Sequence, residues 1–156
     1  MVKFNGTNND TLKLTLLGFE TYKSDNPNRI FTENDWLSIR VELQTKHGYI
    51  DHIFGAYLYY EFEWLIDWIS DISDHKPIIN SVPFSEPLLR FEKDFYNNDN
   101  FIYFYYGHLI KNEDFYDEFL ETDNYTMIFN WTPEEFKVII EGLKIEFEKV
   151  SLNKKD

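Results

Sequence analysis

The feature that most constrains the fold is a strict two-residue alternation of apolar and polar side chains over residues 36–45. Such alternation is typical of a strand that buries one face and exposes the other to water. The apolar positions are Leu37, Ile39, Val41 and Leu43, and the polar positions are Ser38, Arg40, Glu42 and Gln44. A short turn at residues 46–48 follows, so we expect residues 49–54 to return as the second strand of an antiparallel hairpin.

Further strands are predicted on both sides of this hairpin. Leu12, Leu14 and Leu16 alternate with polar residues, which indicates a strand over residues 11–19. Extended runs are also expected over residues 88–95, 101–109 and 125–131. Because short turns link neighbouring strands, antiparallel pairing is favoured.

Two segments change to a helical period. Apolar side chains recur at steps of three and four over residues 55–72, which predicts an amphipathic helix. A second helix is predicted over residues 132–150, where Thr132 would be the N-cap and Glu135 would complete a capping box. The expected buried faces are Leu58, Phe62, Leu65, Ile69 and Ile72 in the first helix and Phe136, Ile139, Ile140, Leu143 and Phe147 in the second.

These elements predict an α+β fold. We expect a largely antiparallel sheet of about six to seven strands with two amphipathic helices packed on it. The 156 residues fit a single domain over residues 1–156. No apolar stretch approaches the ~20 residues of a membrane helix, and the N-terminal residues lack the apolar core of a secretion signal. A soluble, cytoplasmic protein with no membrane partner is therefore expected.

The charge balance restricts the possible partners. The chain has 28 acidic and 15 basic residues, which gives a formal net charge of −13. Direct nucleic-acid binding is disfavoured, because contacts to phosphates need clustered lysine and arginine, whereas a basic partner is favoured. The absence of cysteine excludes disulfides, cysteine-ligated zinc and thiol catalysis.

No arrangement typical of a catalytic or metal site stands out. The four histidines, His47, His52, His75 and His108, have no spacing that would bring two of them together on a predicted helix. Glycine-rich phosphate loops and serine elbows are missing. We therefore expect no catalytic residues, no metal site and no cofactor, so the chain is not expected to be an enzyme. An enzyme would require a convergent set of histidine and carboxylate groups in a cleft, and His52 and His108 together with an aspartate or glutamate would be such a set.

Negative charge is concentrated over residues 91–125, which hold nine acids and two bases. Two interpretations remain open: a solvated acidic loop, or a docking surface on which acids steer a basic partner and aromatic side chains anchor it. For the second interpretation, the candidate partner-binding residues are Asp114, Phe115, Tyr116, Asp117, Glu118, Phe119, Glu121 and Asp123.

The aromatic strand at residues 101–109 is open to two interpretations as well. One of its two faces belongs to the core, and the other is either covered by a helix or exposed as an aromatic platform. The two sets are Phe101, Tyr103 and Tyr105 on one face and Ile102, Phe104 and Tyr106 on the other. Trp64 and Trp68 share one face of the first predicted helix, where we expect both to pack in the core.

Three strings resemble motifs of the WapI-family immunity proteins and occur in the same order. Residues 35–41 (Asp-Trp-Leu-Ser-Ile-Arg-Val) resemble the family's Trp-Leu-x-Val/Ile-x-Val strand. Residues 60–69 (Tyr-Glu-Phe-Glu-Trp-Leu-Ile-Asp-Trp-Ile) are similar to its Glu-Leu-x-x-Leu-Ile-Asp-Trp-Leu helix, and residues 84–91 resemble its Glu-Pro-x-Leu-x-Phe segment. The chain departs from the pattern at residues 57–60, and residues 110–125 have no counterpart.

The resemblance implies an intracellular antidote. Such a protein binds the C-terminal domain of a cognate bacterial toxin and blocks it without catalysis, and the namesake toxin is a nuclease that cleaves tRNA. A basic, nuclease-type toxin domain is the expected partner, and the chain would be a monomer or a homodimer. The alternative is a small-molecule or glycan-binding module that stacks its ligand on Tyr103, Tyr105, Trp64 or Trp68.

Overall fold

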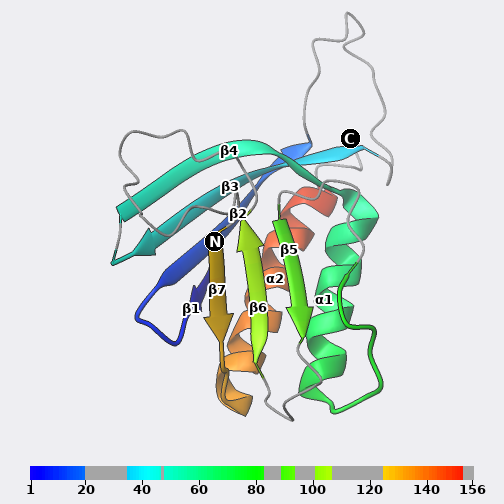
Figure 1. Cartoon of the computed structure of the whole chain (residues 1–156). Coiled ribbons are helices and arrows are strands. Elements are labelled where there is room, and N and C mark those ends of the chain that lie inside the picture. Colours follow the sequence, from blue (N-terminus) through cyan, green and yellow to red (C-terminus); the bar gives the residue numbers. More distant parts are fainter. Residues whose placement is uncertain (20–34, 47, 83–88, 94–100, 107–124, 153–156) are drawn as a thin grey trace, which may run out of the picture.

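The computed structural model describes residues 1–19, 35–46, 48–82, 89–93, 101–106 and 125–152. Its strands form two antiparallel sheets (Figure 1). The first sheet has four strands in chain order: β1 (Val2–Asn5), β2 (Thr11–Phe19), β3 (Trp36–Thr45) and β4 (Gly48–Leu58). The second has three: β5 (Leu89–Lys93), β6 (Ile102–Tyr106) and β7 (Tyr125–Phe129).

The predicted fold class and hairpin are confirmed, but the strands divide between two sheets. Leu43 pairs with Ile50 and Thr45 pairs with Gly48, as the alternation over residues 36–45 predicts. Because β4 leads directly into a helix, the chain leaves the first sheet there, and β5–β7 pair with one another instead. β1 was not predicted, because its four residues contain only two apolar side chains, Val2 and Phe4.

Helix α1 (Tyr59–Ser73) begins four residues later than the sequence predicted. Leu58 still belongs to β4, where it pairs with Trp36 in the register of the sheet. The helix starts where the Glu61 carboxylate accepts a hydrogen bond from the Leu58 backbone N–H, with 2.9 Å between nitrogen and oxygen. Glu61 is therefore buried as a capping group, on the same face of the helix as Leu65 four residues later.

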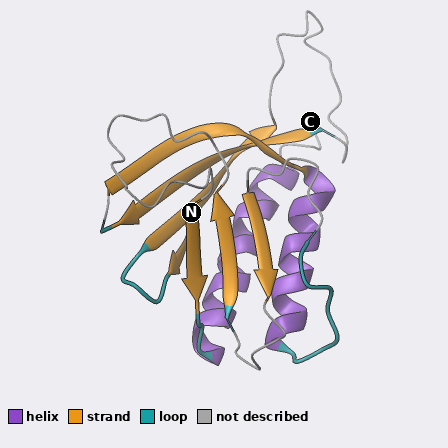
Figure 2. Ribbon diagram, viewed as in Figure 1, coloured by secondary structure: helices purple, strands orange, loops and turns teal. Residues whose placement is uncertain are grey.

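Helix α2 (Pro133–Leu152) has the predicted capping box. The Glu135 backbone N–H donates to the Thr132 hydroxyl at 3.2 Å, and the Thr132 backbone N–H donates to the Glu135 carboxylate at 2.8 Å. The two helices lie side by side, behind the three-stranded sheet in the view of Figure 2. In the described part of the chain, neither helix has an apolar stretch of the length needed to cross a membrane.

One continuous core joins both sheets and both helices. The ring of Phe4 lies near its centre, 6.1 Å from the ring of Phe91 in β5 and 5.9 Å from that of Phe129 in β7, measured between centroids. A Cβ atom on Gly142 would lie 3.3 Å from a methyl carbon of Val2, so glycine allows α2 to approach β1 closely. The buried face of edge strand β1 therefore contacts both α2 and the second sheet.

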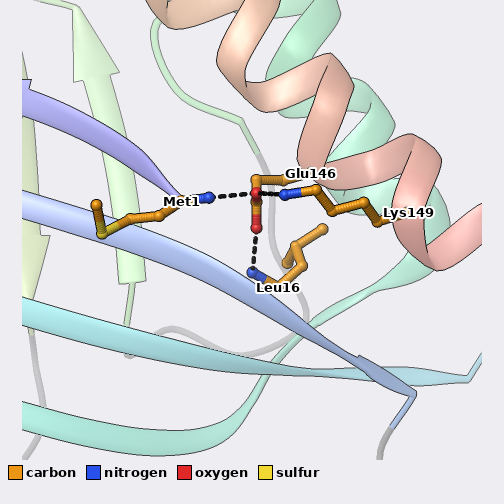
Figure 3. A network of polar contacts seen from close by, with 4 residues as sticks. All are labelled: Met1, Leu16, Glu146 and Lys149. Atoms are coloured by element: carbon orange, nitrogen blue, oxygen red, sulfur yellow. Dashed lines mark hydrogen bonds and ion pairs between the residues drawn. The ribbon is translucent and has the colours of Figure 1, made fainter.

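A buried carboxylate ties α2 to the first sheet (Figure 3). Glu146 is only 2% exposed, and its side chain accepts a hydrogen bond from the Leu16 backbone N–H at 3.3 Å. It also forms ion pairs with the amino group of Met1 and the ammonium group of Lys149. Burial alone would raise the pKa of Glu146, but the hydrogen bonds from Lys149 and the amino group outweigh burial and lower it.

Candidate functional site

The predicted acidic docking segment lies outside the described residues. All eight candidates, Asp114, Phe115, Tyr116, Asp117, Glu118, Phe119, Glu121 and Asp123, fall between residues 107 and 124. The candidate site in the described part of the chain must therefore be found on the sheets and helices.

The outer face of the first sheet carries two clusters of paired charges, beside exposed apolar side chains such as Ile53. The guanidinium of Arg40 lies 2.7 and 2.5 Å from the two carboxylate oxygens of Asp51, and this hydrogen-bonded pair lowers the pKa of Asp51. Lys13 lies 3.7 Å from Glu42, which also accepts a hydrogen bond from the Tyr49 hydroxyl at 3.0 Å. Because these cross-strand pairs are exposed to water and satisfy one another, Arg40, Glu42 and Asp51 offer little unpaired charge to a partner.

The aromatic strand β6 has one core face and one partly exposed face. Ile102, Phe104 and Tyr106 are buried, whereas Tyr103 and Tyr105 are half-buried and stack on each other with 6.5 Å between ring centroids. The Arg90 guanidinium lies over the Tyr105 ring at 4.5 Å and also pairs with Glu92 at 2.9 Å. Because Arg90 covers the Tyr105 ring, this face is a poor platform for stacking a ligand.

The histidines give no support to a metal or catalytic site among the described residues. The His52 Nδ1 atom and the Tyr106 hydroxyl are hydrogen-bonded at 2.9 Å, and burial raises the pKa of Tyr106 to about 12. His75 follows the end of α1, and both His47 and His108 lie outside the described residues. No group of three potential ligands that could hold a metal ion occurs in the ranges that the structure describes.

An open groove of about 390 Å³ lies beside residues 64–71 of α1, and we call it the α1 groove. The segment that follows α1 folds back along the helix and forms the other wall (Figure 1). The lining residues are Trp64, Asp67, Trp68, Asp71, Pro77, Ile78, Ile79 and Val82. A mainly apolar groove with a few polar groups at its edge is typical of a binding site.

Two tryptophans have different roles in the α1 groove. Trp68 is 5% exposed, and its indole N–H donates to the Ile79 carbonyl at 2.8 Å, so it fixes the far wall to the helix. Trp64 is 48% exposed, and its ring rests edge-on against Tyr60 with 4.8 Å between centroids. Core packing was thus the correct expectation for Trp68 and the wrong one for Trp64, because the far wall covers only the first of the two.

Two smaller cavities lie around the start of α2, with volumes of about 180 and 140 Å³, and Trp131 lines both. The buried indole N–H of Trp131 has no hydrogen-bond partner among the described residues. Lys3, Glu134 and Glu135 all line the larger of these two cavities, so its lining carries both signs of charge. This mixed lining favours no particular class of ligand.

Comparison with protein families matches residues 3–151 to the family described as "Immunity protein WapI-like family". The match covers both sheets and nearly all of α2. Neither a curated protein nor a solved structure matches the chain.

Proposed function

Because the chain belongs to the WapI-like immunity protein family, we propose that it is an intracellular immunity protein that binds and blocks a cognate toxin domain without catalysis. The observation that carries this proposal is the family match over residues 3–151. The net charge of −13 favours a basic toxin domain, such as a nuclease whose cleft binds nucleic-acid phosphates. The eight acidic-segment candidates at residues 114–123 remain the proposed contacts outside the described ranges.

The test is co-expression in a bacterial host. Toxin C-terminal domains from the source genome are produced one at a time, with and without this chain. We expect one of them to arrest growth when alone and to be neutralised when the chain is present, with a stable complex on size-exclusion chromatography. If every toxic domain still arrests growth and none forms a complex, the proposed function is wrong.

A separate measurement tests whether the chain blocks the toxin by binding alone, without catalysis. After the complex is separated under denaturing conditions and the toxin is refolded, its mass and activity should equal those of toxin never exposed to the chain. A changed mass or a permanently inactive toxin would instead indicate covalent modification by the chain.

The acidic segment is tested by charge reversal. Lysine substitutions at Asp114, Asp117 and Glu121 should weaken toxin binding by about tenfold or more. They remove the negative charge that attracts a basic toxin domain during its approach, and the ion pairs that the three acids would form in the complex. The matched control carries lysine at Glu134, Glu141 and Glu148, three exposed acids of α2, and has the same net charge. Equal affinities for the two triple variants would show that the acidic segment is not the contact surface.

A second candidate function, a small-molecule or glycan-binding module, is favoured by one observation, the α1 groove with its exposed Trp64 ring. Sugar rings commonly stack on such faces. This candidate predicts a change in tryptophan fluorescence on titration with neutral oligosaccharides and no protection against any toxin domain.

A further inference from the structure

The electrostatics of α1 are unfavourable for the helix itself. Between Tyr59 and Ser73 the helix carries four acids and no basic residue, and two of the acids, Asp67 and Asp71, lie in its second half. Asp67 lies four residues from both Glu63 and Asp71, and like charges at this spacing reduce the stability of a helix. Residues that reduce the stability of their own helix in this way are often found at binding sites.

One of these acids is compensated and one is not. The Lys76 ammonium lies 2.9 Å from the Asp74 carboxylate and 3.0 Å from that of Asp71, and these hydrogen bonds raise the pKa of Lys76. Asp67 is exposed at the edge of the α1 groove, and in the described part of the chain it makes no ion pair or hydrogen bond. Among the described residues, the groove therefore presents a carboxylate without an ion-pair partner, one helical turn from the exposed Trp64 ring.

The α1 groove is also held in place before any partner arrives. The segment that forms the far wall is bonded to α1, because the Trp68 indole N–H donates to the Ile79 carbonyl. It is also bonded to β5, because the Lys93 backbone N–H donates to the Asn80 carbonyl at 2.8 Å. Ser81 forms a further bridge to Glu92. A preformed apolar groove reduces the entropy that binding would cost.

We propose that the α1 groove receives an arginine side chain of the cognate toxin domain, an inference that rests on the proposed function. The guanidinium would stack on the exposed face of Trp64 and pair with Asp67, while its aliphatic stem would lie against Ile79 and Pro77. Arginine fits better than lysine, because its planar group stacks on an indole and pairs with a carboxylate at the same time. A neutral sugar would leave Asp67 uncompensated.

The first experiment measures the affinity of the toxin domain that co-expression identifies. Asp67→Lys should raise the Kd by about tenfold or more, as expected for a central contact. The matched control is Glu141→Lys on the exposed face of α2, which changes the net charge equally and should raise the Kd by less than about twofold. Trp64→Ala should weaken binding similarly, whereas Val138→Ala, at a 72% exposed position, should not.

These results separate the two proposals. If the wild type protects cells and the groove variants bind as well as their controls, the groove inference is wrong and the immunity function stands. Equal weakening by Asp67→Lys and Glu141→Lys also overturns the inference, because it shows a response to net charge alone. Asp67 and Glu141 are both exposed, so neither lysine substitution disturbs the core. The circular dichroism spectrum of each variant verifies that it is folded.

A second experiment decides the inference if no toxin domain is bound. The indole N–H signals of the four tryptophans are followed by nuclear magnetic resonance during titration with the capped peptide Arg-Leu-Arg. Signals of Trp64 and Trp68 should shift while those of Trp36 and Trp131 stay in place, and Asp67→Asn should abolish the shifts. Failure of the Trp64 signal to move, or an equal response to Glu-Leu-Glu or to maltotriose, overturns the inference.

Discussion

The Glu146 carboxylate of α2 accepts a hydrogen bond from the backbone N–H of Leu16 in β2, at 3.3 Å and across 130 residues of sequence. The same carboxylate pairs with the Met1 amino group and with Lys149, so one side chain satisfies groups from the first sheet and the last helix. A buried charge is tolerated only when it is paired in this way.

Glu146→Gln should lower the free energy of unfolding by about 2–3 kcal/mol, because the charge-assisted bonds are lost while the side-chain volume is kept. Urea denaturation followed by circular dichroism measures the change. Glu148→Gln, two residues away on the exposed side of α2, is the matched control and should stay within about 0.5 kcal/mol of the wild type. Equal midpoints for both variants would show that the buried network adds no stability.

The same carboxylate predicts a pH dependence. Its pKa is lowered below the ordinary value of 4.5 in the folded protein, so the unfolded chain takes up the proton first as the pH falls. The stabilisation from Glu146 should be complete above 4.5 and should decrease below it. The stability difference between wild type and Glu146→Gln, measured by urea denaturation, should therefore be constant from about pH 7 to about pH 5 and narrow at lower pH. If the stability difference between wild type and Glu146→Gln instead grew as the pH fell, the pKa of Glu146 would not be lowered by folding.

The backbone conformation at the end of α1 predicts how substitutions of His75 rank in stability. His75 has a φ of 55°, in the left-handed region, while its N–H donates to the Ile72 carbonyl at 3.1 Å and the Lys76 N–H donates to the Asp71 carbonyl at 2.9 Å. Glycine is preferred at this position of a helix terminus. His75→Gly should be more stable than His75→Ala by about 1 kcal/mol, because only glycine adopts this φ without strain. Thermal unfolding of the two variants measures the difference, and a more stable alanine variant would refute the prediction.

The capping box of α2 can be tested in the same way. Thr132→Ala removes the acceptor for the Glu135 N–H and should cost about 1 kcal/mol of stability. Thr132→Ser keeps the hydroxyl and should retain most of that stability. If serine loses as much as alanine in urea denaturation, the hydroxyl is not the stabilising group.

Local periodicity was sufficient to predict most of the secondary structure. The alternation at residues 36–45, the hairpin that follows it and the box at Thr132 and Glu135 are all local patterns, and the structure confirms them. The start of α1 was misplaced because the β4 register, set by pairing with β3, extends the strand into residues that also fit the helical stripe. The division into two sheets was not predicted, because strand pairing between distant segments leaves no local pattern.

The candidate site was less predictable than the fold. Trp64 and Trp68 occupy the same helix face, and only the position of the segment after α1 decides that one is buried and the other exposed. Glu146 could have been found, since it lies three residues after Leu143 on the otherwise apolar stripe of α2. A charged residue on a buried stripe indicates a buried partner, although the sequence does not say which partner.

The position of Phe4 has a consequence for how quickly the molecule folds. Its ring partners Phe91, Phe129 and Trp131 all belong to the second half of the chain. The β3–β4 hairpin can form from neighbouring residues, but the two sheets join only when the first strand meets residues from the far end of the sequence. Contacts between residues so far apart in the sequence require a large loop of chain to close. The entropy lost on closing this loop opposes folding until the contacts have formed. We therefore expect slow folding, with docking of the N-terminal strand as a late step.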